Sequence, residues 1–334
     1  MTHNGTPWPP SCEATENENY SSAWHVVALF VILGCSLLGT VLPILGKRVS
    51  AFRVPEYAYA IGKSVATGVV LGVALIHMLK PANESLTSDC MPSALRNFSK
   101  PLAYIICIAS VAAMHSLEAC LRVFFDGFGA VRDLPIASGE SQHLLSGSQA
   151  GGHHFHPSAP AVDSWKSSGG LQILSAVLLE FGVSLHSLFV GLTVGMCADA
   201  ELYTLMCALS FHQFFEGVAL GSRLVDAALT LRTEYVLAAV FVLSAPLGTA
   251  VGIMCVCEHI INTKGSMYLL TQGILDSVCA GILLYIGFQL LVGDFYADMQ
   301  STVHNVRSPR GFLLAMLVAL WAGVSIMALI GQYV

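Results

Sequence analysis

Long apolar stretches separated by short polar segments cover most of the chain. A helix that crosses a bilayer needs about 20 mainly apolar residues, and eight stretches reach that length. They span residues 24–46, 57–79, 101–124, 171–195, 202–222, 235–257, 267–293 and 311–333. The pattern therefore predicts an all-α integral membrane protein with eight transmembrane helices. Only a few residues join the fourth and fifth helices, so we expect these two to be antiparallel neighbours.

One polar segment is much longer than the others. Residues 125–168 are rich in glycine, serine and histidine and poor in large apolar side chains, so they cannot bury enough surface to fold. We interpret them as a disordered cytosolic loop. The loop divides the chain into three helices within residues 24–124 and five within residues 169–334, a 3+5 arrangement.

The same loop contains two candidate regulatory features. His153, His154 and His156 form a histidine cluster, which is a weak candidate metal site, and a merely solvated linker is an equal alternative. Lys166 is the only lysine of the loop. It is the natural acceptor if ubiquitin-dependent removal from the surface regulates the protein.

Orientation follows from the lysines and arginines, which favour the cytosolic side of a membrane. With the N-terminus outside, eleven of the 15 basic residues fall on the cytosolic side and four fall outside. Residues 1–23 are polar and acidic without the basic start of a signal peptide, so we interpret them as an extracellular tail. Four N-x-S/T sequons, which mark glycosylated segments, all lie outside in this assignment. They are Asn4, Asn19, Asn83 and Asn97. An even number of spans then places both termini outside the cell.

Composition narrows the class of function. Only 11% of the residues are charged, compared with about 25% in a soluble domain, and the mean hydropathy is +0.69. A net charge of −6 without a basic tract gives no support for nucleic-acid binding. The absence of a Walker motif argues against an ATP-driven pump. Most of the ten cysteines lie in apolar stretches and are expected to pack as small hydrophobes. Cys12 and Cys90 lie in segments assigned outside, which leaves a disulfide between them open.

Histidines and a glutamate lie within the fourth and fifth apolar stretches. Ionisable side chains at bilayer depth are costly and by default face the bundle interior as part of a functional site. His212 and Glu216 are four residues apart, so a helix places them on one face. Counted from the short connection between the two helices, His186 lies at a similar depth. Imidazole and carboxylate groups are ligands for zinc and ferrous iron, so the pattern predicts a metal site near mid-membrane.

Other polar side chains within the spans are less specific. His77, His115, Glu118, Glu180 and Asp276 could each line an ion path or form an interhelical hydrogen bond, and the sequence leaves both interpretations open.

Small residues and a proline bear on packing. Gly191-x-x-x-Gly195 and Gly217-x-x-x-Gly221 are patterns that let helix backbones approach closely. Pro246 in the sixth span removes one backbone hydrogen bond and is expected to kink that helix.

Two segments carry a resemblance to a known family. The fourth span reads Leu179-Glu180-Phe181-Gly182-Val183-Ser184-Leu185-His186-Ser187, and the fifth reads Phe211-His212-Gln213-Phe214-Phe215-Glu216-Gly217. They resemble the signatures of the ZIP (Zrt/Irt-like protein) family of divalent-metal transporters, in its branch of plant and protist iron and zinc transporters. The second span, with Gly68-Val69-Val70-Leu71 before His77, and residues 244–248 and 281–285 match as well.

The resemblance implies metal ligands at His186, His212 and Glu216, with Ser187 and Gln213 adjacent. Glu180 and His77, which lie in the matching segments, complete the candidate metal-site residues. The resemblance also implies ATP-independent transport of the free divalent ion into the cytosol.

The chain departs from the family pattern at two positions. Some members carry a glutamate four residues after the fourth-span histidine and another carboxylate just before the sixth-span proline, which together support a two-metal centre. Here these positions are Val190 and Ala245, which leaves the number of metal ions open.

We therefore expect a transporter that imports zinc, ferrous iron or both and has no prosthetic group. An intramembrane zinc hydrolase is the alternative from another class, although the chain has no H-E-x-x-H motif. The expected partners are divalent metal ions and the lipid bilayer, with a homodimer as one alternative for the oligomeric state. The expected location is the plasma membrane, with an endomembrane compartment as the alternative.

Overall fold

The predicted all-helical architecture is confirmed. The computed structural model describes residues 20–49, 54–91, 99–126, 169–227, 229–258 and 266–332, and this part of the chain contains helices and no strand. The extracellular tail up to residue 19 lies outside the described residues, as does most of the predicted cytosolic loop. His153, His154, His156, Lys166 and Cys12 therefore remain at the level of prediction. Cys90 is disulfide-bonded, and the other eight described cysteines are free.

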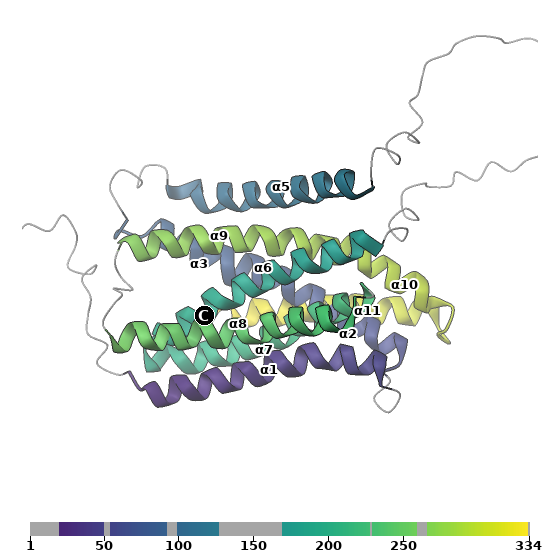
Figure 1. Cartoon of the computed structure of the whole chain (residues 1–334), viewed down its shortest axis with the longest axis horizontal. Coiled ribbons are helices and arrows are strands. Elements are labelled where there is room, and N and C mark those ends of the chain that lie inside the picture. Colours follow the sequence, from purple (N-terminus) through teal and green to yellow (C-terminus); the bar gives the residue numbers. More distant parts are fainter. Residues whose placement is uncertain are drawn as a thin grey trace, which may run out of the picture.

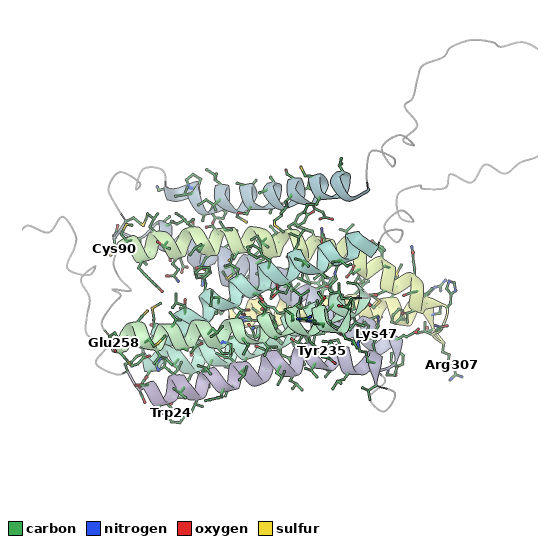
Figure 2. All side chains as sticks on the ribbon, in the orientation of Figure 1. Trp24, Lys47, Cys90, Tyr235, Glu258 and Arg307 are labelled. Atoms are coloured by element: carbon green, nitrogen blue, oxygen red, sulfur yellow. The ribbon has the colours of Figure 1, made fainter. Side chains whose placement is uncertain are left out.

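The helices run nearly parallel or antiparallel to one another in one bundle (Figure 1). Their bounds are α1 Ser22–Arg48, α2 Glu56–Gly72, η3 Val73–Leu79, α3 Lys80–Leu86, α5 Ser99–Asp126, α6 Gly169–Met196, α7 Asp199–Asp226, α8 Leu231–Cys257, α9 Ser266–Gln289, η6 Leu290–Asp294, α10 Phe295–Val303 and α11 Pro309–Ile330. Trp24, Cys90 and Glu258 lie at one end of the bundle, and Lys47 and Arg307 lie at the other (Figure 2). We call these the outer and inner ends, after the orientation expected from the basic residues.

Two of the eight predicted helices continue well beyond their expected C-terminal ends. The second continues from α2 through the π-helical turn η3 and on through α3 to Leu86, and the seventh continues through the π-helical turn η6 and α10 to Val303. The predicted second span ended at residue 79, whereas the helix continues past Pro81, which lies in the first turn of α3 directly after the π-helical turn. The predicted seventh span ended at residue 293, just before Asp294.

Seven described helices are long and apolar enough to cross a membrane, and α7 is not among them. With 28 residues α7 has the necessary length, but its middle carries His212, Gln213 and Glu216. All three of these side chains are fully buried, so other helices rather than lipid surround them. The predicted fifth span is thus a helix of the bundle interior, which explains its low hydropathy.

Glycines bring α6 and α8 into the closest helix pairing of the fold. A Cβ on Gly191 would overlap the carbonyl oxygen of Ala245, and one on Gly248 would overlap that of Leu188. Gly195 and Gly252 face each other one turn further along. Without side chains at these positions the two backbones touch, which is how helices associate in a membrane where no hydrophobic effect drives them together.

A second pairing joins α1 and α7. Gly39 faces the backbone of Phe214, and Gly217 and Gly221 face Thr40. The glycine patterns of the fourth and fifth spans therefore do not pack these two helices against each other. Each packs its helix against a different partner, while α6 and α7 make a smaller contact between them.

The helices form two groups by these contacts. One group comprises α1, α6, α7 and α8, and the other comprises α2 with η3 and α3, α5, α9 and α11. In the second group, Gly68 and Gly323 bring α2 and α11 together in the same way. The groups meet mainly where α2 contacts α7 and where α6 contacts α9.

A buried lysine connects the two groups at the inner end. Lys63 of α2 is 7% exposed, and its Nζ lies 3.1 Å from Asp226 of α7 and 2.8 Å from Asp298 of α10. Asp294 of η6 is 4.0 Å from the same nitrogen and 2.9 Å from Nε of Arg223. Because an unpaired buried charge is very costly, the carboxylates are what allow Lys63 to be buried here.

Two more ion pairs lie at this end. Lys47 pairs with Asp226, and Arg48 pairs with Glu234, whose side chain is almost fully buried. A cavity of about 870 Å³ opens beside them, lined by residues of α1, α2 and α10, among them Lys47 and Asp298. The inner end is therefore held by paired charges, whereas the middle of the bundle is held by apolar packing.

Replacing Gly248 with alanine tests the backbone contact between α6 and α8. We expect Gly248→Ala to lower stability by about 1–3 kcal/mol, the usual cost of overpacking, because the added Cβ meets backbone rather than a flexible side chain. Gly34→Ala is the matched control, since a Cβ there meets nothing within 4 Å. Thermal unfolding of the two purified proteins in detergent compares them, and equal melting temperatures would contradict this packing.

Candidate metal centre

Three buried side chains converge where α6 and α7 meet. His186 lies on α6, and His212 and Glu216 lie one turn apart on α7; all three are 0% exposed. One ligand atom from each lies within 4.8 Å of the others. Nε2 of His186 is 3.5 Å from Oε1 of Glu216, and the two imidazole rings are 5.9 Å apart between centroids. The structure thus brings together the three residues that the sequence predicted.

The polar atoms of this group lack hydrogen-bond partners. Both ring nitrogens of His186, both of His212 and both carboxylate oxygens of Glu216 are buried without one. Burying one such atom without a partner costs roughly 1–3 kcal/mol of folding free energy, so six of them in one place destabilise this part of the fold considerably. Ser210 Oγ, two residues before His212, also lacks a partner. Among the described residues, however, only here do unpaired atoms of two histidines and a glutamate gather within reach of one ion, an arrangement suited to receive a ligand.

A third histidine approaches from the other helix group. His77 lies on η3, is 8% exposed, and packs its ring edge-on against His212 at 4.8 Å between centroids. The π-helical turn that carries it is a feature often found at functional sites. Sequence reasoning placed His77 among the candidates but did not find the turn, because the apolar pattern contains no signal for a single widened turn.

Ser187 and Gln213 lie next to the cluster in sequence and bond to each other. The amide nitrogen of Gln213 donates to Oγ of Ser187 at 3.1 Å, and that hydroxyl lies 3.3 Å from Oε1 of Gln213. Both residues are fully buried. This pair links α6 to α7 one residue beyond His186 and His212, so it fixes the distance between the two helices at the level of the cluster.

Glu180 lies apart from the three clustered residues. Its Oε1 accepts a hydrogen bond of 2.6 Å from Ser184, one turn along the same helix. The metal-ligand grouping found among the described residues contains His186, His212 and Glu216 and does not include Glu180.

The polar residues of α5 form a separate contact. Tyr285 and Gln289 of α9 both donate hydrogen bonds to Glu118, and the ring of His115 packs edge-on against Tyr285. For Glu118 the structure therefore favours the interhelical hydrogen bond over the ion path. Tyr285 and Gln289 were not recognised as its partners, because nothing local in the sequence connects α5 with α9.

Val190 and Ala245, the two positions that depart from the family pattern, are apolar residues in apolar surroundings. Val190 packs against two hydrophobic clusters, and Ala245 is fully buried. The cluster therefore has Glu216 as its single carboxylate among the described residues that can hold a metal.

Comparison with known proteins finds relatives along nearly the whole chain. The profile of the ZIP zinc transporter family matches residues 22–331. Zinc transporter 5 of Oryza sativa subsp. japonica is 32% identical over 313 residues, covering 91% of this chain and 85% of that protein. Zinc-regulated transporter 2 of Saccharomyces cerevisiae is 24% identical and covers 97% of each chain. Zinc transporter 3 of Arabidopsis thaliana is 27% identical and covers 97% of this chain and 90% of that protein.

The match extends from the first described helix to the last and includes the helices that carry the buried histidines and glutamate. On its full-length match and on its relatives, the chain belongs to the ZIP zinc transporter family.

Proposed function

We propose that this protein imports zinc into the cytosol through the bundle, with His186, His212 and Glu216 as the ligands that hold the ion in transit. The observation that carries the proposal is the cluster of six buried polar atoms without partners, contributed by these residues. A divalent ion bound among them gives every one of those groups a partner or a neighbouring positive charge. No other described group of histidine, cysteine and acidic residues has this arrangement.

The distances suit zinc. Bonds of about 2.0–2.1 Å in a tetrahedral site place neighbouring ligand atoms roughly 3.4 Å apart, close to the 3.5 Å between His186 and Glu216. His212 needs only a small side-chain movement to join them. His77 is the natural fourth ligand because its ring already touches His212, and a water molecule is the alternative.

Transport requires that the ion can also leave. Two neutral imidazoles and one carboxylate leave a net charge of +1 on the bound ion, so binding is weaker than in a site with two carboxylates. Conduction needs binding strong enough to replace the ion's water shell but weak enough to release the ion. With valine and alanine at positions 190 and 245, the proposed centre holds one ion.

The two helix groups suggest how access alternates. All three proposed ligands belong to the group of α1, α6, α7 and α8, whereas His77 belongs to the other group. Sliding of one group against the other would carry the ion with its three ligands and release it from His77. The inner charge network around Lys63 spans the same boundary.

The topology inferred from the basic residues completes the proposal. Both termini lie outside, residues 1–23 form the extracellular tail, and the loop at 125–168 is cytosolic between helices within 24–124 and helices within 169–334. The protein acts in the plasma membrane, and a homodimer remains a prediction.

Ferrous iron is the second proposed cargo, since it accepts the same ligands as zinc. The relatives named above are called zinc transporters, which favours zinc. The hydrolase alternative gains no support, because catalysis at a bound metal would need a general base besides the ligands, and Glu216 is the only carboxylate of the cluster.

Alanine at each ligand position should abolish most transport. We expect His186→Ala, His212→Ala and Glu216→Ala each to reduce zinc uptake per surface molecule by ~10-fold or more, equivalent to ~1.4 kcal/mol or more of lost stabilisation. His115→Ala is the control, a histidine at the α5–α9 contact, and should transport normally. Radiolabelled zinc uptake with surface biotinylation provides the measurement, and normal uptake by Glu216→Ala would refute the site.

Labelling of epitope tags tests the topology. A tag before Tyr20 should bind antibody in intact cells, and a tag within residues 125–168 should bind only after permeabilisation, because the basic residues retain the loop in the cytosol. The opposite result for either tag would reverse the assigned orientation.

The loop histidines should be dispensable for conduction. Replacing His153, His154 and His156 together with alanine should leave initial zinc uptake within about twofold, as expected of a segment that does not fold against the helices. Surface abundance in excess zinc should change, and Lys166→Arg should change it in the same assay. A collapse of initial uptake at unchanged surface abundance would place the loop in the transport path.

A further inference from the structure

Asp276 of α9 is an acidic side chain buried in the outer half of the bundle. It is 7% exposed, and no hydrogen bond or ion pair to it occurs among the described residues. The other buried acids outside the metal centre all have partners: Glu118 bonds to Tyr285 and Gln289, Glu180 to Ser184, and Glu234 to Arg48. An unpaired acid in a membrane interior is a functional-site candidate by default.

Contacts around α9 show which way Asp276 points. Gly287 faces Leu71 and Val70 of α2, and residues 11 apart on an α-helix share nearly the same face. Asp276 is 11 residues before Gly287, so it faces the continuous helix of α2 and η3. Its neighbour Tyr268, one face further round, interacts both with Asp276 and with Thr193 of α6. Asp276 therefore lies on the side of α9 turned toward the junction of η3 and α6.

The same contacts give its depth. Gly273 packs against Leu86 and the backbone of Ala82, whereas Gly287 packs at residues 70–71. Interpolating between these contacts places His77 level with about residue 280 of α9. On the other side, Gly182 of α6 packs against Ile282 and Ile286, which places His186 at about the same level. Asp276 is then about one turn, roughly 6 Å, nearer the outer end than both histidines.

Most charges at the outer end of the bundle are acidic. Lys80 is a basic residue at a level similar to Asp276; its Nζ lies 3.5 Å from the carbonyl oxygen of Gly331 at the end of α11, and its charge also acts on His77. Acidic side chains predominate at the outer ends of the described helices: Glu84, Asp89, Asp199, Glu201 and Glu258. Such a surface raises the local concentration of cations.

We propose that Asp276 forms an outer cation site, which holds the incoming divalent ion before it reaches His186, His212 and Glu216. The assignment rests on the proposed transport function and extends it. A single carboxylate replaces part of the ion's water shell without binding it tightly, and the ion then moves about one turn inward to the imidazoles. Successive weak sites allow an ion to advance without being trapped.

Kinetics of an Asp276→Asn protein test the outer site. The apparent KM for zinc uptake should rise about fivefold while Vmax per surface molecule stays within about twofold, because capture is weakened but the inner ligands are intact. Asp276→Glu, which retains the charge, should keep a KM near wild type. Glu118→Gln is the matched control, since it neutralises a similarly buried acid on α5 and should not raise KM.

A charge-restoration experiment separates an electrostatic role from a structural one. Asp276→Cys should show the raised KM, a membrane-impermeant thiol reagent with a sulfonate should lower it toward wild type, and one with a quaternary ammonium should raise it further. The wild-type protein treated alike accounts for the native cysteines. If Asp276→Asn fails to reach the surface, the KM of Asp276→Cys provides the same test.

The outcomes distinguish this site from the proposed function. If Glu216→Gln abolishes uptake and neither Asp276→Asn nor Asp276→Cys raises KM, the outer site is wrong and the inner site stands. A fall in Vmax at unchanged KM also overturns the outer site. If Glu216→Gln transports normally, the proposed function fails and the outer site fails with it.

Discussion

The cost of leaving a polar group unpaired inside a membrane is the constraint on which this structure depends. Backbone N–H and C=O groups avoid this cost because they hydrogen-bond to one another within helices, and the charged side chains avoid it by pairing. Lys63 is buried only because three aspartates surround it, and Glu118 only because Tyr285 and Gln289 donate to it. Against this background, the unpaired atoms of His186, His212 and Glu216 stand apart. Unpaired buried polar atoms, which the described part of the chain avoids almost everywhere else, are concentrated in this cluster. This is the physical reason for proposing that the ion binds there.

Close backbone packing is what keeps that costly arrangement in position. The two helices that carry the proposed ligands touch each other only moderately, but each is fixed on its opposite side by glycine contacts, α6 against α8 and α7 against α1. The hydrogen-bonded pair of Ser187 and Gln213 then sets the spacing between them. The ligand side chains therefore do not need to attract one another. They are held near one point because the glycine contacts with α8 and α1 fix the positions of α6 and α7.

The boundary between the two helix groups passes beside the proposed ligands. His77 approaches His212 from the opposite group, on a π-helical turn, and Asp276 faces the same boundary about one turn further out. Under the proposed function, a displacement of one group would change the number of ligands around the ion, and hence its affinity, without unfolding any helix. The paired charges around Lys63 lie on the same boundary at the inner end, so the boundary carries compensated charges inside and the single acid Asp276 further out.

The sequence by itself determined the helices and the three clustered residues. Apolar length is a local property, so eight spans could be read directly. The spacing of His212 and Glu216 and the short connection to the helix of His186 left little freedom in where those side chains point. Local patterns could not show that the second and seventh helices continue through π-helical turns, because polar residues there are compensated by distant partners such as Lys63. They could not assign the glycines to α8 and α1, or decide which of Glu118, Glu180 and Asp276 is paired. Those outcomes depend on which faces of helices far apart in sequence meet, and only tertiary packing decides that.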